Sequence, residues 1–322
     1  MIRFLAAGLF ALLMALAEPA SAQMTTMPRA QQQLAMRNIG AVMSAGQDIS
    51  AILIPIMNDP GLASARTKDQ FSAALTRLLP SIADGRSELA SIRAGLQQLP
   101  KIGEPGGLPA LIGVDNAVEN MLALSLLADG ILADYEALAE AIAADDQLRI
   151  DAVSRSLLKG PILLLEANAV SMRSQLPLIG SDSTEYALLE GMACFYDGAA
   201  AFYDGAYGFS TREDAAASMA SAQTCMVSQI EDGRANFAAE SRNVPPVPTA
   251  QRMYQQVIPV IGAMFDHQAT GADLLAEARG ALMEGWGMLQ LVGTYDARII
   301  AFQLDFSRLQ QRLVTINQTQ GR

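Results

Sequence analysis

Apolar residues recur along almost the whole chain at alternating spacings of three and four, which is the repeat of one helix face. Three long stripes carry this pattern, from Phe71 to Leu99, from Val114 to Ile142 and from Ile299 to Ile316. No comparable segment alternates with a period of two, so no β-strand is expected. The pattern predicts an all-α fold, an antiparallel helical bundle of about eight helices.

Turn-forming residues separate the predicted helices. They lie at Asn58–Gly61, Lys101–Gly113, Asp145–Asp146, Pro177–Ser183, Gly208–Thr211 and Val244–Pro248. Two of these turns are followed by capping boxes, Asp182 with Glu185 and Ser210 with Glu213, in which the first residue is expected to cap the next helix.

Two details of the helix boundaries are less strongly determined by the sequence. Within residues 250–318 the break between the last two helices falls either at Gly280 or at Gly293-Thr294. Pro80 is expected to begin a helix, because a proline inside a helix removes a backbone hydrogen bond and clashes with the preceding turn.

A short motif occurs once in each half of the chain. Ile82-x-Asp84-Gly85-Arg86-x-x-Leu89-Ala90 matches Ile230-x-Asp232-Gly233-Arg234-x-x-Phe237-Ala238. The match suggests two duplicated four-helix halves, a first half over 23–180 and a second over 181–322; chance similarity between helices rich in Ala and Leu is the alternative.

The first 22 residues have the features of a secretory signal peptide. Arg3 is followed by an uncharged apolar run from Phe4 to Ala17, and then by the small residues Ala20-Ser21-Ala22 of a cleavage site. We therefore expect residues 1–22 to be cleaved and the mature protein to be periplasmic or secreted. The alternative is an uncleaved membrane anchor. No later uncharged apolar run reaches the length of a spanning helix, about 20 residues, so no transmembrane span is expected in the mature chain.

The net charge of −11 limits the classes of partner. A strongly acidic chain is repelled by nucleic-acid phosphates and by anionic membrane surfaces, so no nucleic-acid partner is expected. The charge favours solubility or a cationic partner.

Cys194 and Cys225, the two cysteines of the chain, lie at equal distances from the predicted turn at Gly208–Thr211. On two antiparallel helices joined by that turn, residues equally far from it face each other. Because export exposes the chain to an oxidising compartment, the spacing predicts a disulfide between them.

Small residues follow each cysteine at helical spacing. The stripes run through Gly191, Cys194, Gly198, Ala201, Gly205 and Gly208 on one helix and through Ser218, Ser221, Cys225, Ser228, Asp232 and Ala235 on the next. A disulfide requires a closer approach than ordinary helix pairs make. We therefore expect these two stripes to pack on each other.

Aromatic residues lie on another side of the first of these helices. Phe195, Phe202 and Phe209 share one face by their heptad spacing, with Tyr203 beside it. This side either packs as core or lines an apolar ligand cavity, with Met264 and Trp286 among the expected neighbours. The candidate ligand-binding residues are Phe195, Phe202, Tyr203, Phe209, Met264 and Trp286.

The sequence contains few groups suited to catalysis. His267 is the sole histidine, and it belongs to no di-metal, zinc or nucleophile motif. We expect no catalytic residues, no metal site and no cofactor. Non-covalent haem held by His267 and a methionine is the alternative.

Three functional classes are compatible with these observations. The leading hypothesis is a non-enzymatic periplasmic bundle that binds an apolar small molecule or lipid in a cavity lined by Ala, Met and aromatic side chains. The alternative is an envelope scaffold or protein–protein interaction module with no small-molecule ligand. An enzyme is disfavoured, because the chain lacks a recognisable catalytic set. An enclosed apolar cavity would favour the first class, and an exposed apolar surface the second.

Overall fold

The protein is helical throughout the part that the computed structural model describes, residues 28–57, 59–104, 107–243 and 248–320. The helices are α3 (Arg29–Met57), α4 (Pro60–Ser64), α5 (Lys68–Gln97), α6 (Pro109–Ala143), α7 (Gln147–Arg173), the 3₁₀ turn η1 (Leu176–Leu178), α8 (Thr184–Tyr207), α9 (Arg212–Arg242), α10 (Pro248–Met283) and α11 (Met288–Gln320). No strand occurs in these ranges, and every helix except α4 and η1 is long. The predicted all-α bundle is confirmed. The predicted signal peptide and residues 244–247 of the predicted linker lie outside the described residues.

Side-chain caps begin the helices where the sequence changes from turn to apolar stripe. Asp59, Thr67, Asp146, Ser183 and Thr211 each accept a hydrogen bond from a backbone N–H of the following first turn. Such caps satisfy N–H groups that have no partner within the helix. In the two predicted capping boxes the cap is one residue later than expected, at Ser183 and Thr211. Both helices therefore begin one residue later than predicted. The Ser183 side chain accepts from the N–H of Tyr186, and the Thr211 side chain accepts from the N–H of Asp214.

Two further boundary predictions need correction. The break between α10 and α11 lies between Met283 and Met288 and not at Gly280 or Gly293-Thr294; Gly285 makes this turn with a φ of 83°, a left-handed conformation that suits glycine. Pro80 lies inside α5 and does not begin a helix. Packing of the α5 stripe on its neighbours outweighs the lost backbone hydrogen bond at that position.

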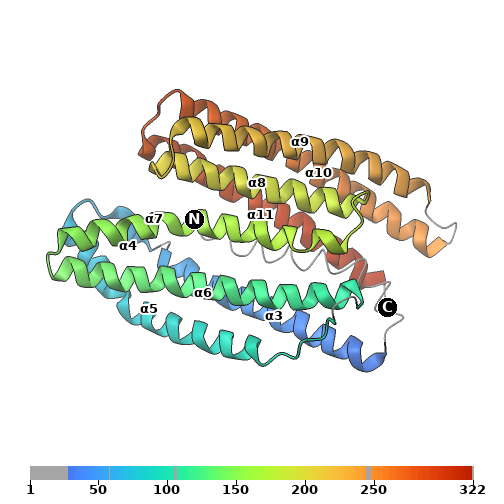
Figure 1. Ribbon diagram of the computed structural model, residues 1–322, viewed down its shortest axis with the longest axis horizontal. Helices are drawn as coiled ribbons and strands as arrows, with labels where there is room; N and C mark the ends of the chain where they lie inside the picture. The colour runs from blue at the N-terminus through green and yellow to red at the C-terminus, as the bar shows by residue number, and fades with distance from the viewer. Residues whose placement is uncertain (1–27, 58, 105–106, 244–247, 321–322) are drawn as a thin grey trace.

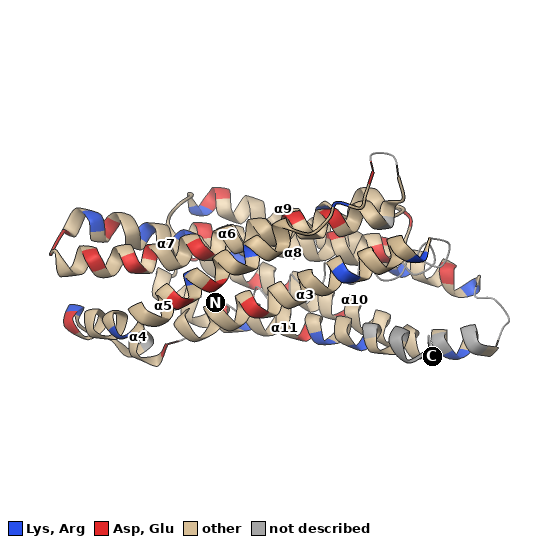
Figure 2. Ribbon diagram, turned by 90° about the horizontal axis from the view of Figure 1, so that it is seen from below, with Lys and Arg blue, Asp and Glu red and all other residues tan. Residues whose placement is uncertain are grey.

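The long helices are arranged in two layers (Figures 1 and 2). α6, α7, α8 and α9 lie side by side in chain order, and α3, α10 and α11 lie on the other side of this row. α5 packs against α3 and α6 at one edge of the molecule. α8 is the most enclosed helix, since it contacts α7, α9, α10 and α11.

The buried apolar side chains form two clusters. The first is built from α3, α5 and α6, and the second from α8, α9, α10 and α11. α7 contributes to both, since Leu164 belongs to the first cluster while Leu165 and Ala169 belong to the second. The helix therefore connects the two cores. The sequence predicted a division of the chain between 180 and 181, which places α7 entirely in the first half. That division into two halves stays a prediction.

The repeated motif occupies similar positions in α5 and α9. Ile82 and Gly85 are buried in α5, as Ile230 and Gly233 are in α9. The arginine that follows pairs with an acid of the next helix in both cases, Arg86 with Asp129 and Arg234 with Asp266. Descent of the two halves from one duplicated unit stays a prediction.

Among the helices of the described residues, two are long and apolar enough to cross a membrane by length and composition. They cover Arg29–Leu62 and Leu111–Ala143. About half of the apolar window in each is buried inside the bundle, 44% and 50% respectively. Core helices of bundles commonly show this combination, because their apolar surface packs on neighbouring helices.

Candidate functional site

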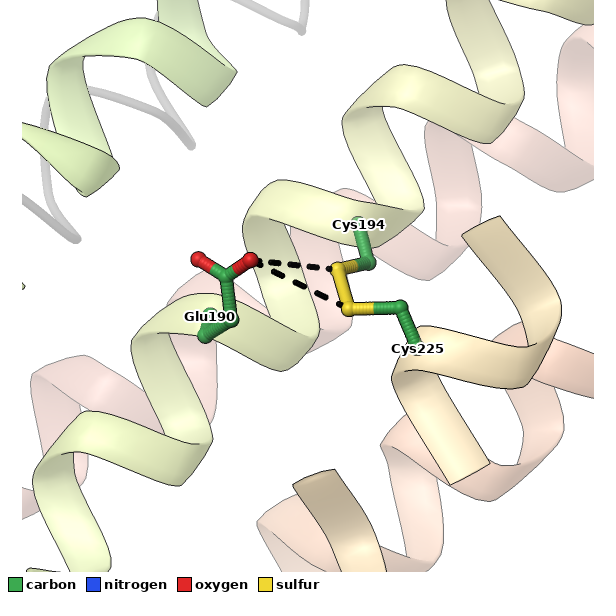
Figure 3. Close-up of side chains that lie close together, drawn as sticks. All are labelled: Glu190, Cys194 and Cys225. Atoms are coloured by element: carbon green, nitrogen blue, oxygen red, sulfur yellow. Dashed lines mark hydrogen bonds between the residues drawn. A yellow bond between two sulfur atoms is a disulfide. The ribbon is translucent and has the colours of Figure 1, made fainter. Parts of the chain in front are cut away.

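The α8–α9 hairpin is built around a close helix contact. Gly208 ends α8 in a left-handed conformation with a φ of 73°, and Thr211 caps α9. A Cβ added to Gly205 would lie 2.5 Å from Cβ of Ala215, so the two backbones approach closely here. Cys194 and Cys225 are joined as a disulfide with their Cα atoms 6.1 Å apart (Figure 3). The hairpin therefore has the disulfide that its cysteine spacing predicts.

The small-residue stripe predicted for α9 is wrong in its position around the helix. α9 presents Ala215, Met219 and Ala222 to the core, whereas Ser218 and Ser221 are exposed. Ser228, Asp232 and Ala235 of the predicted stripe are exposed as well. Burial of the larger apolar residues of α9 decides how the helix is rotated. Cys225 is partly exposed as a result, and the disulfide lies at the rim of the contact and not at its centre.

The aromatic side of α8 is covered by α10 and α11. Phe195, Phe202 and Tyr203 have no exposed surface, and Met264 is also buried. Phe195 packs on Phe302 with ring centroids 4.0 Å apart, and Phe202 meets Tyr295 edge-on at 5.7 Å. The Tyr203 hydroxyl donates a hydrogen bond of 2.6 Å to Asp296 Oδ1. Burial, reinforced by the Asp296 charge, raises the pKa of Tyr203 well above its usual value, so the phenol is neutral.

The other two candidate ligand residues lie in turns. Phe209 follows the end of α8 and therefore does not continue the heptad face of Phe195 and Phe202; the Lys159 ammonium lies 5.1 Å from its ring centroid. Trp286 lies in the α10–α11 turn, where its ring nitrogen donates to Glu284. Both are partly buried against the second core. The structure thus brings four candidates into one packed core and leaves Phe209 and Trp286 at its edge.

An ion-pair cluster adjoins the disulfide on the side of α7. Arg173 at the end of α7 pairs with Glu190 at 3.2 Å and with Asp197 at 2.7 Å, and its Nη2 donates to Cys194 Sγ at 3.6 Å. Glu190 Oε1 lies 3.6 Å from Cys194 Sγ and 3.9 Å from Cys225 Sγ (Figure 3). Sulfur atoms of a disulfide carry no proton, so the carboxylate contacts both sulfurs without receiving a hydrogen bond from either. Among the described residues, Glu190, Cys194 and Cys225 bring their possible ligand atoms within 4.8 Å of one another.

An acidic row continues along the same side of α8. It consists of Glu166 of α7 with Asp197 and Asp204 of α8, and Glu166 feels the charge of both aspartates. Partial burial raises the pKa of Glu166 above its usual value; Asp204 and Asp197 raise it further, while Lys159 opposes the shift. Since Asp197 is paired with Arg173, Glu166 and Asp204 carry the remaining negative charge of this row on the surface of α7 and α8.

Apolar side chains lie exposed beside the acidic row. Leu163 and Val170 are 44% and 64% exposed on one face of α7, and Leu126 of α6 is 60% exposed. Asn120 of α6 donates to Ser174 at 3.1 Å, and a Cβ on Gly160 would lie 3.2 Å from Ile131, which fixes how α6 and α7 are aligned. With this alignment Leu126 lies between the levels of Leu163 and Val170. We name Leu126, Leu163 and Val170 the apolar face.

A cavity lies between the end of α5 and the N-terminal part of α6. It has a volume of about 200 Å³ and is lined by Leu96, Gln97, Leu99, Pro100, Lys101, Asp115, Val118, Glu119 and Leu122. The Lys101–Glu119 ion pair lies at its exposed rim. This cavity lies in the first half of the chain and contains none of the candidate ligand residues, which belong to the second core.

None of the protein-family models, curated proteins and solved structures with which the chain was compared matches it. Functional inference therefore rests on the residues and geometry described above.

Sequence reasoning missed the Glu190 cluster, the apolar face and the α5–α6 cavity. Glu190 precedes Cys194 by one helical turn, so the spacing already placed the carboxylate and the cysteine on one face. The apolar face had no comparable signal, because Leu126, Leu163 and Val170 lie within stripes that are apolar on several sides. The alignment of α6 with α7 is needed to bring them together.

Proposed function

We propose that the protein is an exported, non-enzymatic helical bundle that binds a partner protein in the cell envelope. The partner chemistry that the surface favours is a cationic amphipathic helix. The observation that carries the proposal is the exposed apolar face, Leu126, Leu163 and Val170, in which Leu163 and Val170 lie one helical turn on either side of the acidic Glu166. Partner contact removes exposed apolar surface from water, which is the main favourable term in association.

The form of the surface favours a helix as the bound element. The exposed apolar residues lie on the neighbouring helices α6 and α7, and an amphipathic helix binds apolar surfaces through residues spaced three, four and seven apart. Basic side chains on one edge of a helix lying there would face Glu166 and Asp204. The net charge of −11 adds long-range attraction for a cationic partner.

The packing of the second core bears on the choice between a carrier and an interaction module. Phe195, Phe202 and Tyr203 are enclosed by side chains of α10 and α11, so the aromatic wall expected to receive an apolar ligand is filled by the protein itself. A carrier with its ligand on these residues would have to separate α11 from α8. An interaction module requires no such opening.

Binding of a defined peptide tests the proposal. The probe is a helical peptide with leucines on one face and lysines on the other, and its matched control replaces every lysine by glutamate. Full burial of a Leu or Val side chain contributes roughly 1.5–3 kcal/mol. Because Leu163 and Val170 are already partly covered in the free protein, Leu163→Ser and Val170→Ser should each weaken binding about tenfold. Val227→Ser, which changes an exposed apolar residue of α9, is the control variant. Equal affinity of the parent protein for both peptides, or equal loss with Val227→Ser, would contradict the proposal.

The cavity at the α5–α6 junction favours a second candidate function, binding of a small apolar molecule. Its volume of about 200 Å³ exceeds that of an engineered cavity of about 150 Å³ that binds benzene. A single ring therefore suits it better than a full lipid chain. Titration with a one-ring aromatic, followed by NMR, should shift the methyl signals of Leu96 and Val118, and Leu122→Trp should abolish the shifts by filling the cavity. Unchanged methyl signals in the parent protein would end this candidate.

A further inference from the structure

We propose that Glu190, Cys194 and Cys225 form a binding site for one thiophilic divalent cation of the Zn²⁺ class when the disulfide is reduced. The inference is independent of the proposed partner binding. It assigns a second state to the α8–α9 hairpin, in which a metal ion replaces the disulfide as the cross-link between the two helices.

The carboxylate already lies at ligand spacing from both sulfurs. A tetrahedral Zn²⁺ with Zn–S bonds of about 2.3 Å and a Zn–O bond of about 2.0–2.2 Å separates S and O by about 3.5–3.7 Å. Glu190 Oε1 lies 3.6 Å from Cys194 Sγ and 3.9 Å from Cys225 Sγ. Only the two sulfurs must move, from bonded contact to a separation of about 3.8 Å, which side-chain rotation of the cysteines provides. A solvent molecule can occupy the fourth position.

The surrounding charge suits this ligand set. Two thiolates and one carboxylate carry three negative charges, and Zn²⁺ with the neighbouring Arg173 guanidinium supplies three positive charges. Arg173 donates to Cys194 Sγ at 3.6 Å and pairs with Glu190 and Asp197, so it stabilises a Cys194 thiolate before the metal ion arrives. Asp197, which also pairs with Arg173, leaves the cluster with one net negative charge once the metal ion is bound.

Reduction can begin at the exposed end of the disulfide. Cys225 is partly exposed, whereas Cys194 is 2% exposed. A thiolate of a dithiol reductant attacks Cys225 Sγ, the S–S bond breaks, and its electron pair leaves on Cys194 Sγ beside Arg173. The second thiol of the reductant then attacks the mixed disulfide and releases Cys225. The protein gains two electrons and the reductant becomes a cyclic disulfide. The metal ion displaces the remaining thiol protons into solvent.

Cobalt titration of the full chain tests the site. The protein is reduced with a phosphine, which binds the metal ion less competitively than a dithiol, and Co²⁺ is added without oxygen. We expect one Co²⁺ per chain with thiolate-to-cobalt charge-transfer absorption, displaced by Zn²⁺. Glu190→Gln should weaken Co²⁺ binding about tenfold or more. Loss of a residue that only supports a metal ligand already weakens affinity about tenfold, and Glu190 is proposed as a ligand itself. Glu231→Gln removes the same charge from the exposed side of α9 and should leave the affinity unchanged.

Three results would overturn the proposal. The first is the lack of charge-transfer absorption in the reduced parent protein, and the second is equal Co²⁺ affinity in the parent and Glu190→Gln proteins. The third is full Co²⁺ binding by the Cys194→Ser/Cys225→Ser variant. If reduction loosens the hairpin, thermal unfolding followed by circular dichroism provides a second measurement of metal binding. Zn²⁺ should then raise the melting temperature of the reduced parent protein but not that of reduced Glu190→Gln, and an equal response of both proteins, or no response, counts against the site.

Discussion

Phe195 of α8 and Phe302 of α11 pack with ring centroids 4.0 Å apart at an interplanar angle of 35°. His267 of α10 also stacks on Phe302, with ring centroids 4.3 Å apart. The Nε2–H group of His267 donates a hydrogen bond of 2.6 Å to the Phe302 backbone carbonyl. The helices α8, α10 and α11 are therefore joined at one aromatic cluster. This cluster occupies the position at which the sequence suggested a ligand cavity.

Truncation on the aromatic side of α8 should be costly. Phe202→Ala removes a fully buried ring and should lower the free energy of unfolding by about 3–5 kcal/mol. Leu289→Ala, at an 85% exposed position in the first turn of α11, should change it by less than about 0.5 kcal/mol. Urea denaturation of both variants measures the difference. A loss below about 1 kcal/mol for Phe202→Ala would show that the ring faces open space, since truncation in a packed core costs more.

Two glycines should respond to alanine in opposite directions. Gly205→Ala places a methyl group 2.5 Å from Cβ of Ala215, so α8 and α9 must separate, at a cost of about 1–3 kcal/mol. Gly280→Ala lies inside α10, where nothing is within 4 Å of the added methyl group, and should stabilise by about 0.5–1 kcal/mol through the higher helix propensity of alanine. Thermal melting of the pair checks the helix contact, and a shift of the same sign for both would argue against it.

Loss of the disulfide should weaken the fold without abolishing it. The disulfide joins two residues with a sequence separation of 31. Restricting the unfolded chain by a loop of this size should add about 3–4 kcal/mol to the free energy of unfolding. Cys225→Ser and reduction of the parent protein should lower stability by similar amounts. Denaturation with and without reductant provides the measurement. If reductant leaves the parent protein unchanged while Cys225→Ser is destabilised, the loss comes from packing of the serine and not from the missing cross-link.

The raised pKa of Glu166 gives a pH-dependent prediction. The folded state binds the Glu166 proton more tightly than the unfolded state, so ionisation of this group lowers stability as pH rises above the ordinary value of 4.5. Glu166→Gln should therefore raise the melting temperature at neutral pH. The gain should disappear well below pH 4.5, where the parent carboxyl is protonated in both states. A gain that persists in acid would assign the effect to packing and not to charge.

The sequence predicted the fold class and the disulfide because both depend on local periodicity. The apolar stripes specify helices, and the symmetric placement of Cys194 and Cys225 about one turn specifies their contact. The rotation of α9 was not predictable in this way. Small residues occur on two sides of that helix, and Met219 and Ala222 face the core only because burying them removes more apolar surface from water.

The candidate site was predicted only in part, for a related reason. Phe195, Phe202 and Tyr203 do lie together, but what covers them depends on α11, which is distant in sequence. The apolar face likewise joins residues of two helices whose relative alignment no local pattern specifies. Periodicity identifies which side of a helix is apolar, whereas the long-range packing decides whether that side is core or exposed surface.

Photo-crosslinking in the producing cell tests the central proposal most directly. A photoreactive amino acid replaces Leu126 or Leu163 in the apolar face, or Val227 of α9 as the control, and adducts are identified after irradiation. We predict that positions 126 and 163 give the same discrete protein adduct, that its crosslinked segment is a basic amphipathic helix, and that position 227 gives none. Adducts to lipid alone, equal labelling from position 227, or no adduct at either position of the apolar face would contradict the account.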